Sequence, residues 1–135
     1  MCLLAIERSA SENRKCRLAI CDDVTTFRQL VSAVFRWEPG FELVGEASNG
    51  LEAVELARRV QPDVMFLDIA MPVMDGIEAL PKIREASPST RVIVLTAFGS
   101  ASIRSRALAD GAVAYLEKGV TPAVMIAAVR SALER

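Results

Sequence analysis

The sequence predicts an α/β protein whose five-stranded parallel sheet is doubly wound, with helices on both faces. Short apolar runs alternate five times with longer segments whose apolar residues recur at helical spacing. Strands that alternate with helices in this way form parallel sheets, because each crossover helix packs back onto the sheet. The 135 residues suffice for one domain with a substantial core.

The first strand is expected at Arg17–Cys21, a short apolar run. A helix should follow, capped by Thr25 or Thr26 and ended by Pro39-Gly40. Its apolar residues recur at helical spacing, at Phe27, Leu30, Val31, Val34 and Phe35. Phe41–Ala47 alternates in part between apolar and polar residues and predicts the second strand.

The middle of the chain repeats this order. Asn49-Gly50 turns the chain into a second helix, which Pro62 ends. Val64–Leu67 is a continuous apolar run, typical of a strand buried on both faces. A third helix is expected over Ile77–Ala86, where Pro81 should remove a hydrogen bond or kink the helix unless the helix starts late.

The last two units are equally regular. Arg91–Ala97 is the most β-branched run and predicts the fourth strand. A helix over Ala101–Ala109 should end at Gly111, and Ala112–Leu116 should form the fifth strand. The final helix is expected to begin at Thr121-Pro122, a cap followed by a first-turn proline, and to run to the C-terminus.

Composition excludes several function classes. The chain has no histidine, which removes histidine-based acid–base catalysis and histidine metal sites. A net charge of -1 gives no argument for binding nucleic acid or membranes. The three cysteines lack metal-ligand spacing and predict a reducing compartment, and no apolar run is long enough to span a membrane. We therefore expect a cytoplasmic protein.

Residues 1–15 are expected to form a flexible leader and residues 16–135 the domain. The stretch from Glu7 to Lys15 is polar without a clear period, which is typical of a frayed terminus. The alternative is a short docking segment that uses the apolar residues before it, Leu3, Leu4 and Ile6.

Polar residues follow four of the five strands at the point where each strand ends. They are Asp22 and Asp23 after the first strand, Asp68 after the third, Thr96 at the end of the fourth and Lys118 after the fifth. The carboxyl ends of parallel strands meet at one edge of the sheet, where α/β proteins bind ligands. Taken singly, each of these residues has an ordinary explanation as a cap, a strand-end hydroxyl or a solvated lysine. Together they indicate one site.

Such a site is suited to a divalent cation and a phosphoryl group. Clustered carboxylates repel one another, and Mg²⁺ relieves that repulsion through oxygen ligands. Lys118 and Thr96 can hold phosphate oxygens, one as a charge and the other as a hydroxyl donor. An aspartate that attacks phosphorus in this setting forms an aspartyl phosphate, and Asp68 is the candidate nucleophile.

With these residues in place, the chain from about Arg17 to Arg135 resembles the receiver domain of two-component response regulators. The segments that carry the resemblance are Asp22-Asp23, Asp68 to Met71-Pro72 with Asp75-Gly76, Leu95-Thr96-Ala97 and Tyr115-Leu116-Glu117-Lys118. The resemblance implies a flavodoxin-like fold with strand order 2-1-3-4-5. It also implies that a histidine kinase or a phosphotransfer protein supplies the phosphoryl group.

The resemblance assigns a role to each site residue. Asp68 would be the phosphoacceptor, and Mg²⁺ (or Mn²⁺) would be held by Asp23, Asp68 and the main-chain carbonyl of Ala70, with Asp22 acting through a metal-bound water. Lys118 would pair first with Asp68 and then with the phosphate.

The implied switch begins at Thr96, which would move to bond a phosphate oxygen, and Tyr115 would follow from an outward to an inward rotamer. The surface of the fourth helix, fifth strand and fifth helix would then change and control an output partner or domain, including a transcriptional one.

One feature departs from the family pattern, and another indicates a subgroup of the family. Gly119 follows Lys118, where many family members have proline after a cis bond. The Lys-Gly pair looks closer to receivers joined to LuxR-type helix-turn-helix domains. We expect either a stand-alone receiver or a regulator whose C-terminal part is cut away, with no direct contact to nucleic acid by this chain.

Two further hypotheses concern the last helix and the phosphoryl lifetime. The helix after Thr121 is apolar almost all round, which predicts either a deep core helix or an outer face that forms a homodimer or output surface.

Ala70 and Phe98 lie two residues after Asp68 and Thr96, and neither can orient an attacking water. We therefore expect a persistent phosphoryl group.

Two other function classes compete with the switch. A phosphorylation-independent interaction module on this fold would typically have lost an acid or the lysine, and this chain keeps them. A phosphatase with an aspartyl-phosphate intermediate commonly places a second Asp where Ala70 stands, and no glycine-rich nucleotide loop is present.

Overall fold

A computed structural model describes residues 14–97 and 99–134. Most of the expected leader, together with Phe98, therefore lies outside the described residues. Strands and helices alternate along the described chain as the sequence predicts, in the order β1 (Cys16–Cys21), α2 (Thr25–Arg36), β2 (Phe41–Ala47), α3 (Gly50–Val60), β3 (Val64–Leu67), α4 (Gly76–Ala86), β4 (Arg91–Thr96), α5 (Ala101–Ala109), β5 (Ala114–Glu117) and α6 (Pro122–Leu133).

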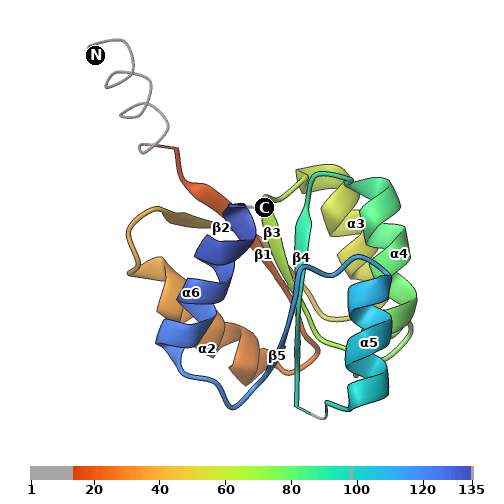
Figure 1. Ribbon diagram of the computed structural model, residues 1–135. Coiled ribbons are helices and arrows are strands. Elements are labelled where there is room, and N and C mark those ends of the chain that lie inside the picture. Colours follow the sequence, from red (N-terminus) through yellow and green to blue (C-terminus); the bar gives the residue numbers. More distant parts are fainter. Residues whose placement is uncertain (1–13, 98, 135) are drawn as a thin grey trace.

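The five strands form one parallel sheet in the order β2-β1-β3-β4-β5, which confirms the predicted fold class and strand order. Helices α2 and α6 cover one face, and α3, α4 and α5 cover the other (Figure 1). The order reverses between β1 and β3, so the two strands that carry the acidic residues are neighbours in the centre of the sheet.

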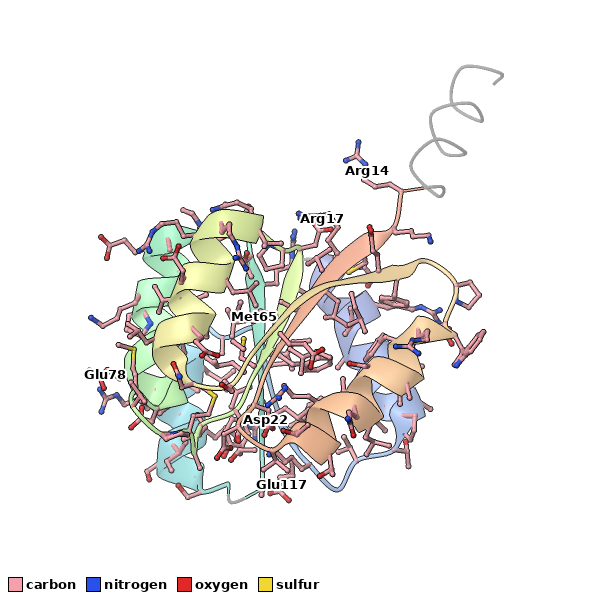
Figure 2. All side chains as sticks on the ribbon, turned by 180° about the vertical axis from the view of Figure 1, so that it is seen from behind. Arg14, Arg17, Asp22, Met65, Glu78 and Glu117 are labelled. Atoms are coloured by element: carbon pink, nitrogen blue, oxygen red, sulfur yellow. The ribbon has the colours of Figure 1, made fainter. Side chains whose placement is uncertain are left out.

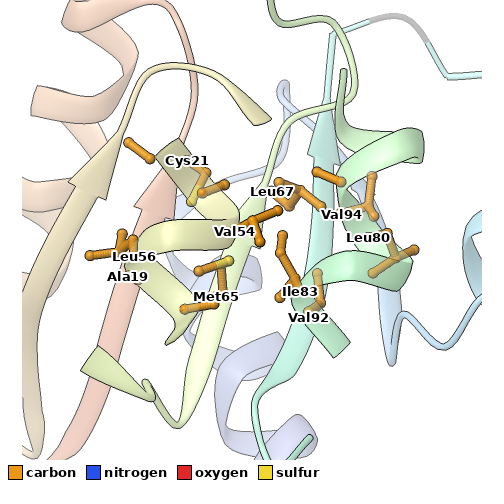
Figure 3. Close-up of a cluster of buried hydrophobic side chains, with 14 of the residues drawn as sticks. Ala19, Cys21, Val54, Leu56, Met65, Leu67, Leu80, Ile83, Val92 and Val94 are labelled. Atoms are coloured by element: carbon orange, nitrogen blue, oxygen red, sulfur yellow. The ribbon is translucent and has the colours of Figure 1, made fainter. Parts of the chain in front are cut away.

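Each face of the sheet has its own apolar core. Met65 and Leu67 of β3 point toward α3 and α4, where they meet residues such as Val54 and Leu80 (Figure 3). Alternate residues of the same strand, Val64 and Phe66, pack on the other face, against α2 and α6. Successive side chains of a strand point to opposite faces, so a strand that is apolar throughout must be covered on both.

The cysteines of the described region belong to these cores. Cys16 packs on the α2/α6 face and Cys21 on the opposite face, both buried and free. Burial raises the pKa of Cys16 to about 11, and it raises the pKa of Cys21 further. These thiols therefore act as small apolar side chains, in agreement with the absence of any metal-ligand spacing.

Three elements differ in local detail from the expectations. The first helix is capped at Val24 without a side-chain cap, and neither Thr25 nor Thr26 takes that position. Helix α4 begins at Gly76 and continues through Pro81, which lies on its exposed side. Strand β5 begins two residues later than predicted, because the Ala112 amide still donates to Ala107 O of the preceding turn at 3.0 Å.

A network of buried polar groups closes the amino edge of the sheet. Thr90 Oγ1 donates to Pro62 O at 2.6 Å and lies 2.6 Å from Ser87 Oγ. Gln61 accepts from Ser87 Oγ at 3.0 Å, and the Arg17 guanidinium donates to the main-chain oxygens at the end of α3. This edge is distant from the acidic residues, which follow the other ends of the strands (Figure 2).

Candidate functional site: an acidic cluster at the carboxyl edge

Three strands deliver charged side chains to one place at the carboxyl edge. The last residues of β1 and β3, Cys21 and Leu67, are paired in register, and the Asp68 amide donates to Cys21 O at 2.9 Å. Asp68 therefore lies beside Asp22. On the other side, the Lys118 amide donates to Thr96 O at 2.9 Å, which fixes the backbone of the lysine at the end of β4.

The three aspartates form a cluster. Asp22, Asp23 and Asp68 each offer a carboxylate oxygen, and these oxygens lie within 4.8 Å of one another. Asp22 and Asp68 are buried, whereas Asp23 is exposed. Three carboxylates at this separation, two of them shielded from water, repel one another strongly unless a cation lies among them. Their hard oxygen donors suit Mg²⁺ or Mn²⁺.

Lys118 supplies a positive charge to this cluster. Its Nζ atom lies 2.6 Å from Asp22 Oδ2 and 3.2 Å from Asp68 Oδ2. Burial by itself lowers the pKa of Lys118, but the contacts with Asp22 and Asp68 outweigh it and the pKa is raised. The lysine therefore stays charged, and one ammonium group bridges two buried carboxylates.

The two buried carboxylates are not equivalent. Asp22 is engaged through both oxygens, because Oδ1 accepts the Val24 amide at 2.9 Å and Oδ2 binds Lys118. Asp68 Oδ1 is buried and has no hydrogen-bond partner within the described chain. Burial and the neighbouring Asp22 raise the pKa of Asp68, against the opposing effects of Lys118 and of the nearby Ile69 backbone amide. One oxygen of Asp68 is thus available for chemistry or for a cation.

The start of helix α4 packs against Asp68 and holds the intervening loop close to it. A Cβ atom on Gly76 would overlap the Asp68 main-chain oxygen, so only glycine lets α4 begin there. Asp75 caps that helix by accepting the Glu78 amide at 2.8 Å, as its position before the glycine suggests. The loop between Asp68 and Asp75 is strained at Val73, which has φ +69°. The Val73 side chain is 78% exposed. Ala70 lies exposed in the same loop.

Thr96 and Tyr115 lie on the neighbouring strands β4 and β5, where Thr96 pairs with Glu117, the residue before Lys118. Thr96 is buried at the end of β4, and Tyr115 is half-buried on the neighbouring strand. The Tyr115 hydroxyl is buried without a hydrogen-bond partner in the residues described, and a Cβ on Gly99 would come within 2.6 Å of it. The missing side chain of Gly99 therefore makes the space that this hydroxyl occupies.

Two residues beside the site were not singled out from the sequence. The Arg28 guanidinium donates to Asp22 O at 2.6 Å and pairs with Glu46 at 3.1 Å, so it ties the ends of β1 and β2 together. Phe27 places its ring beneath Lys118. Both lie on the first turns of α2, and Phe27 had been assigned to the apolar face alone. Only their proximity to the acidic pair along the chain could have drawn attention to them.

The family model for the response regulator receiver domain matches residues 18–130. The chain belongs to this family. Relatives among well-described proteins include the chemotaxis protein CheY of Thermotoga maritima, 34% identical over 84% of this chain and 93% of that protein. The transcriptional regulatory protein PdtaR of Mycobacterium tuberculosis is 39% identical over 88% of this chain and 57% of its own length.

Solved structures give the same result for the receiver fold. The receiver domain of the response regulator NarL from Mycobacterium tuberculosis superposes with a TM-score of 0.85 at 33% identity, covering 90% of this chain and 98% of that domain. CheY in the CheX–CheY–BeF3–Mg²⁺ complex from Borrelia burgdorferi gives a TM-score of 0.81 at 32% identity, covering 85% and 87%.

Membership in this family states the general role of the domain. Receiver domains are the phosphoacceptor domains of two-component signalling and act as switches, with an acidic pocket that binds Mg²⁺. The chain spans 54% of the Bacillus subtilis regulatory protein YxjL and 57% of PdtaR, so those proteins extend beyond the matched region. Within the residues described, no helix combines the length and the apolar character needed to cross a membrane.

Proposed function

We propose that Asp68 accepts a phosphoryl group from a phosphohistidine on a histidine kinase or phosphotransfer protein. The observation that carries this proposal is the buried Asp68 Oδ1, which has no hydrogen-bond partner within the described residues and lies in a cluster with Asp22, Asp23 and Lys118. An Asp68 oxygen attacks phosphorus, the P–N bond of the donor breaks, and its electron pair returns to the imidazole. A carboxylate attacks in its ionised form, so the transfer needs no general base.

The same cluster fits a divalent cation. Asp23, Asp68 and the main-chain carbonyl of Ala70 would hold Mg²⁺ or Mn²⁺, and Asp22 would act through a bound water. This division agrees with the contacts of Asp22, whose two oxygens already bind Val24 and Lys118. When bound, the ion would supply positive charge to the phosphoryl oxygens. Lys118 and Thr96 would contact those oxygens from the protein side.

The positions of Thr96 and Tyr115 on adjacent strands support a route from the site to an output surface. Movement of Thr96 toward a phosphoryl oxygen would change the packing of Tyr115, and with it the surface formed by α5, β5 and α6. That surface would control an output domain or partner, and the relatives YxjL and PdtaR are transcriptional regulatory proteins. We assign no direct contact with nucleic acid to this chain, and we place the protein in the cytoplasm.

The outer face of α6 supports a homodimer as one form of output. Met125 and Val129 of α6 are buried, but Val124 is 42% exposed and Leu133 is 38% exposed. A hollow on the outer side of α6 is lined by Ala123, Ile126 and Ala127 of this helix and by Glu38, which follows α2. A second copy of the chain would cover these apolar side chains. Light scattering before and after phosphorylation tests this, and a monomer in both states at high concentration would overturn it.

The phosphoacceptor assignment is tested by mass. Incubation with Mg²⁺ and acetyl phosphate should add one phosphoryl group to the intact protein. Asp68→Ala should abolish this gain, whereas Asp75→Ala, which changes an exposed aspartate of the same loop, should retain it. If neither acetyl phosphate nor beryllofluoride produces a response, the protein is an interaction module that works without phosphorylation.

The lifetime of the phosphoryl group is a separate property of the same site. Ala70 cannot orient a water molecule, and its exposed position in the loop lies two residues beyond Asp68. We expect slow hydrolysis, and Ala70→Asn should accelerate it. An unchanged rate in that variant would remove this part of the proposal. Phe98, the other residue of this hypothesis, lies outside the described residues.

A further inference from the structure

The Lys118 ammonium group has a third neighbour besides the two carboxylates. Its Nζ atom lies 4.5 Å from the centroid of the Phe27 ring. Phe27 is half-buried on the first turn of α2 and packs against the apolar core of that face. An ammonium group over an aromatic face is attracted by the ring quadrupole, more strongly where water is excluded. The Lys118 side chain is only 16% exposed, so the ring replaces water on this side.

The backbone around Lys118 does not by itself fix the position of the ammonium group at the end of the side chain. Gly119 follows it, and apart from its chain neighbours no heavy atom of the described residues lies within 4 Å of the position that a Cβ would occupy there. The ammonium group is carried on a flexible stem of four carbons. Its remaining charged contacts are Asp22 and Asp68, the carboxylates that a cation would also bind. A bound cation competes with the ammonium for these oxygens, whereas it does not compete for the ring.

We propose that Phe27 is a positioning residue, which keeps the Lys118 ammonium beside Asp68 when the carboxylates are engaged by a cation or a phosphoryl group. This inference rests on the proposed function, in which Lys118 contacts the transferred group. The ring attracts the charge without fixing the direction of any N–H bond. The ammonium can therefore exchange a carboxylate for a phosphoryl oxygen by turning, without leaving the site.

The chain offers a matched control for this role. Phe41 also lies near a cation, with Arg130 Cζ 5.8 Å from its ring centroid. It belongs to the same core as Phe27 but opens β2, where it is paired with Cys16 at the amino edge of the sheet. Phe41→Leu therefore loses a comparable ring and cation contact far from the acidic cluster. Any effect specific to Lys118 must be absent from this variant.

The first measurement uses the metal-free protein. Proton–carbon NMR should show the Lys118 Cε methylene shifted by the ring current of Phe27. Phe27→Leu should move this signal to an ordinary lysine value, and Phe41→Leu should leave it in place. A signal at the ordinary value in the wild-type protein would overturn the contact itself, independently of any phosphorylation.

The second measurement is the rate of phosphoryl uptake from acetyl phosphate with Mg²⁺. We expect Phe27→Leu to slow uptake about fivefold, which corresponds to ~1 kcal/mol, while Phe27→Tyr retains the rate. Fluorinated phenylalanine inserted at position 27 keeps the ring shape but weakens its quadrupole. It should slow uptake in steps with the number of fluorine atoms, which serves as the test if Phe27→Leu fails to fold.

The outcomes separate this inference from the proposed function. Equal rates in wild type and Phe27→Leu, or equal losses in Phe27→Leu and Phe41→Leu, would overturn the role of Phe27 and leave Asp68 as the phosphoacceptor. A wild-type protein that takes up no phosphoryl group would overturn the proposed function and this inference with it. A loss confined to Phe27→Leu, with Tyr restoring the rate, supports both.

Discussion

Both edges of the sheet bury polar side chains, but the two edges differ in whether the buried polar atoms are hydrogen-bonded. At the amino edge, Thr90 and Ser87 are fully buried and hydrogen-bonded, with Thr90 Oγ1 2.6 Å from its acceptor, Pro62 O. At the carboxyl edge, Asp68 Oδ1 and the Tyr115 hydroxyl are buried without hydrogen-bond partners in the residues described. Burying a polar atom without a partner costs free energy, whereas a paired one contributes modestly to stability.

This difference separates the parts of the molecule that hold the fold from those that act. Hydroxyls that close a network are consistent with a purely structural role. An unpaired carboxylate oxygen beside a charged lysine, as at Asp68, indicates a site that gives up stability so that a ligand can supply the missing contacts. The four substitutions below test this comparison through the free energy of unfolding, from the largest expected effect to the smallest.

Thr90→Val should have the largest effect. It removes the hydroxyl that donates to Pro62 O, leaves that buried oxygen without this donor and removes the contact with Ser87 Oγ. We expect a loss of about 2 kcal/mol in urea unfolding, with phosphoryl uptake by the folded protein unchanged. Thr90→Ser keeps the hydroxyl and should lose much less. Equal stability of the Val and Ser variants would mean that the network contributes little.

Asp68→Asn should stabilise the metal-free protein at neutral pH by about 1 kcal/mol. The folded-state pKa of Asp68 is raised above its ordinary 3.8. Between these two pKa values the folded protein binds more protons than the unfolded chain, so stability falls as pH rises through this window. The gain in stability of the Asp68→Asn variant should therefore shrink as the pH is lowered toward 3.8 and vanish below it.

Urea unfolding in EDTA across this pH range measures the effect. Added Mg²⁺ should then stabilise wild type more than Asp68→Asn, because the ion loses a ligand in the variant. A variant that is less stable than wild type at neutral pH without metal would contradict the view that ionised Asp68 costs stability.

Val73→Asn should stabilise the protein by about 0.5 kcal/mol. Val73 has φ +69°, a conformation that a β-branched residue adopts at a cost and that Asn tolerates better. Thermal unfolding checks this. The control is Val124→Asn, because Val124 is also exposed but lies within α6, where Asn offers no such relief. A gain in both variants would assign the effect to removal of exposed apolar surface.

Tyr115→Phe should have the smallest effect, a gain in stability of less than about 0.3 kcal/mol. Its buried hydroxyl has no partner within the described chain, so its removal breaks no hydrogen bond and leaves the ring in place. The contrast with Thr90→Val is the sharpest form of the comparison, since each variant loses one buried hydroxyl. A loss from Tyr115→Phe as large as that from Thr90→Val would show that the Tyr115 hydroxyl is paired in solution.

Most of the fold could be predicted because its signals lie within short stretches of the sequence. Val64–Leu67 and Ala101–Ala109 match the observed β3 and α5 residue for residue, since an apolar run and a capped helix are encoded locally. Val73 could not be predicted, because its backbone is imposed by the path from Asp68 to α4. The cap at Val24 was missed for a similar reason, since Asp22 binds the Val24 amide from outside the helix.

The acidic cluster could be predicted because topology alone brings strand ends together. Asp22, Asp68 and Lys118 follow three strands of one parallel sheet, and their meeting needs no knowledge of side-chain rotamers. The contributions of Phe27 and Arg28 depend on how α2 is rotated about its axis against the sheet. That rotation is set by packing between distant segments, which a single sequence does not display.

The way the sheet is threaded also governs when this site comes into existence. Lys118 and Asp68 are 50 residues apart along the chain, and β4 must be inserted between their strands before they meet. Pairings between such distant segments form slowly and depend on the rest of the sheet. A nascent chain that lacks its last two strands has the aspartates but not the lysine that bridges them. The bridged cluster therefore forms only once β5 has joined the sheet, and a partly folded chain has the acidic residues without their counter-charge.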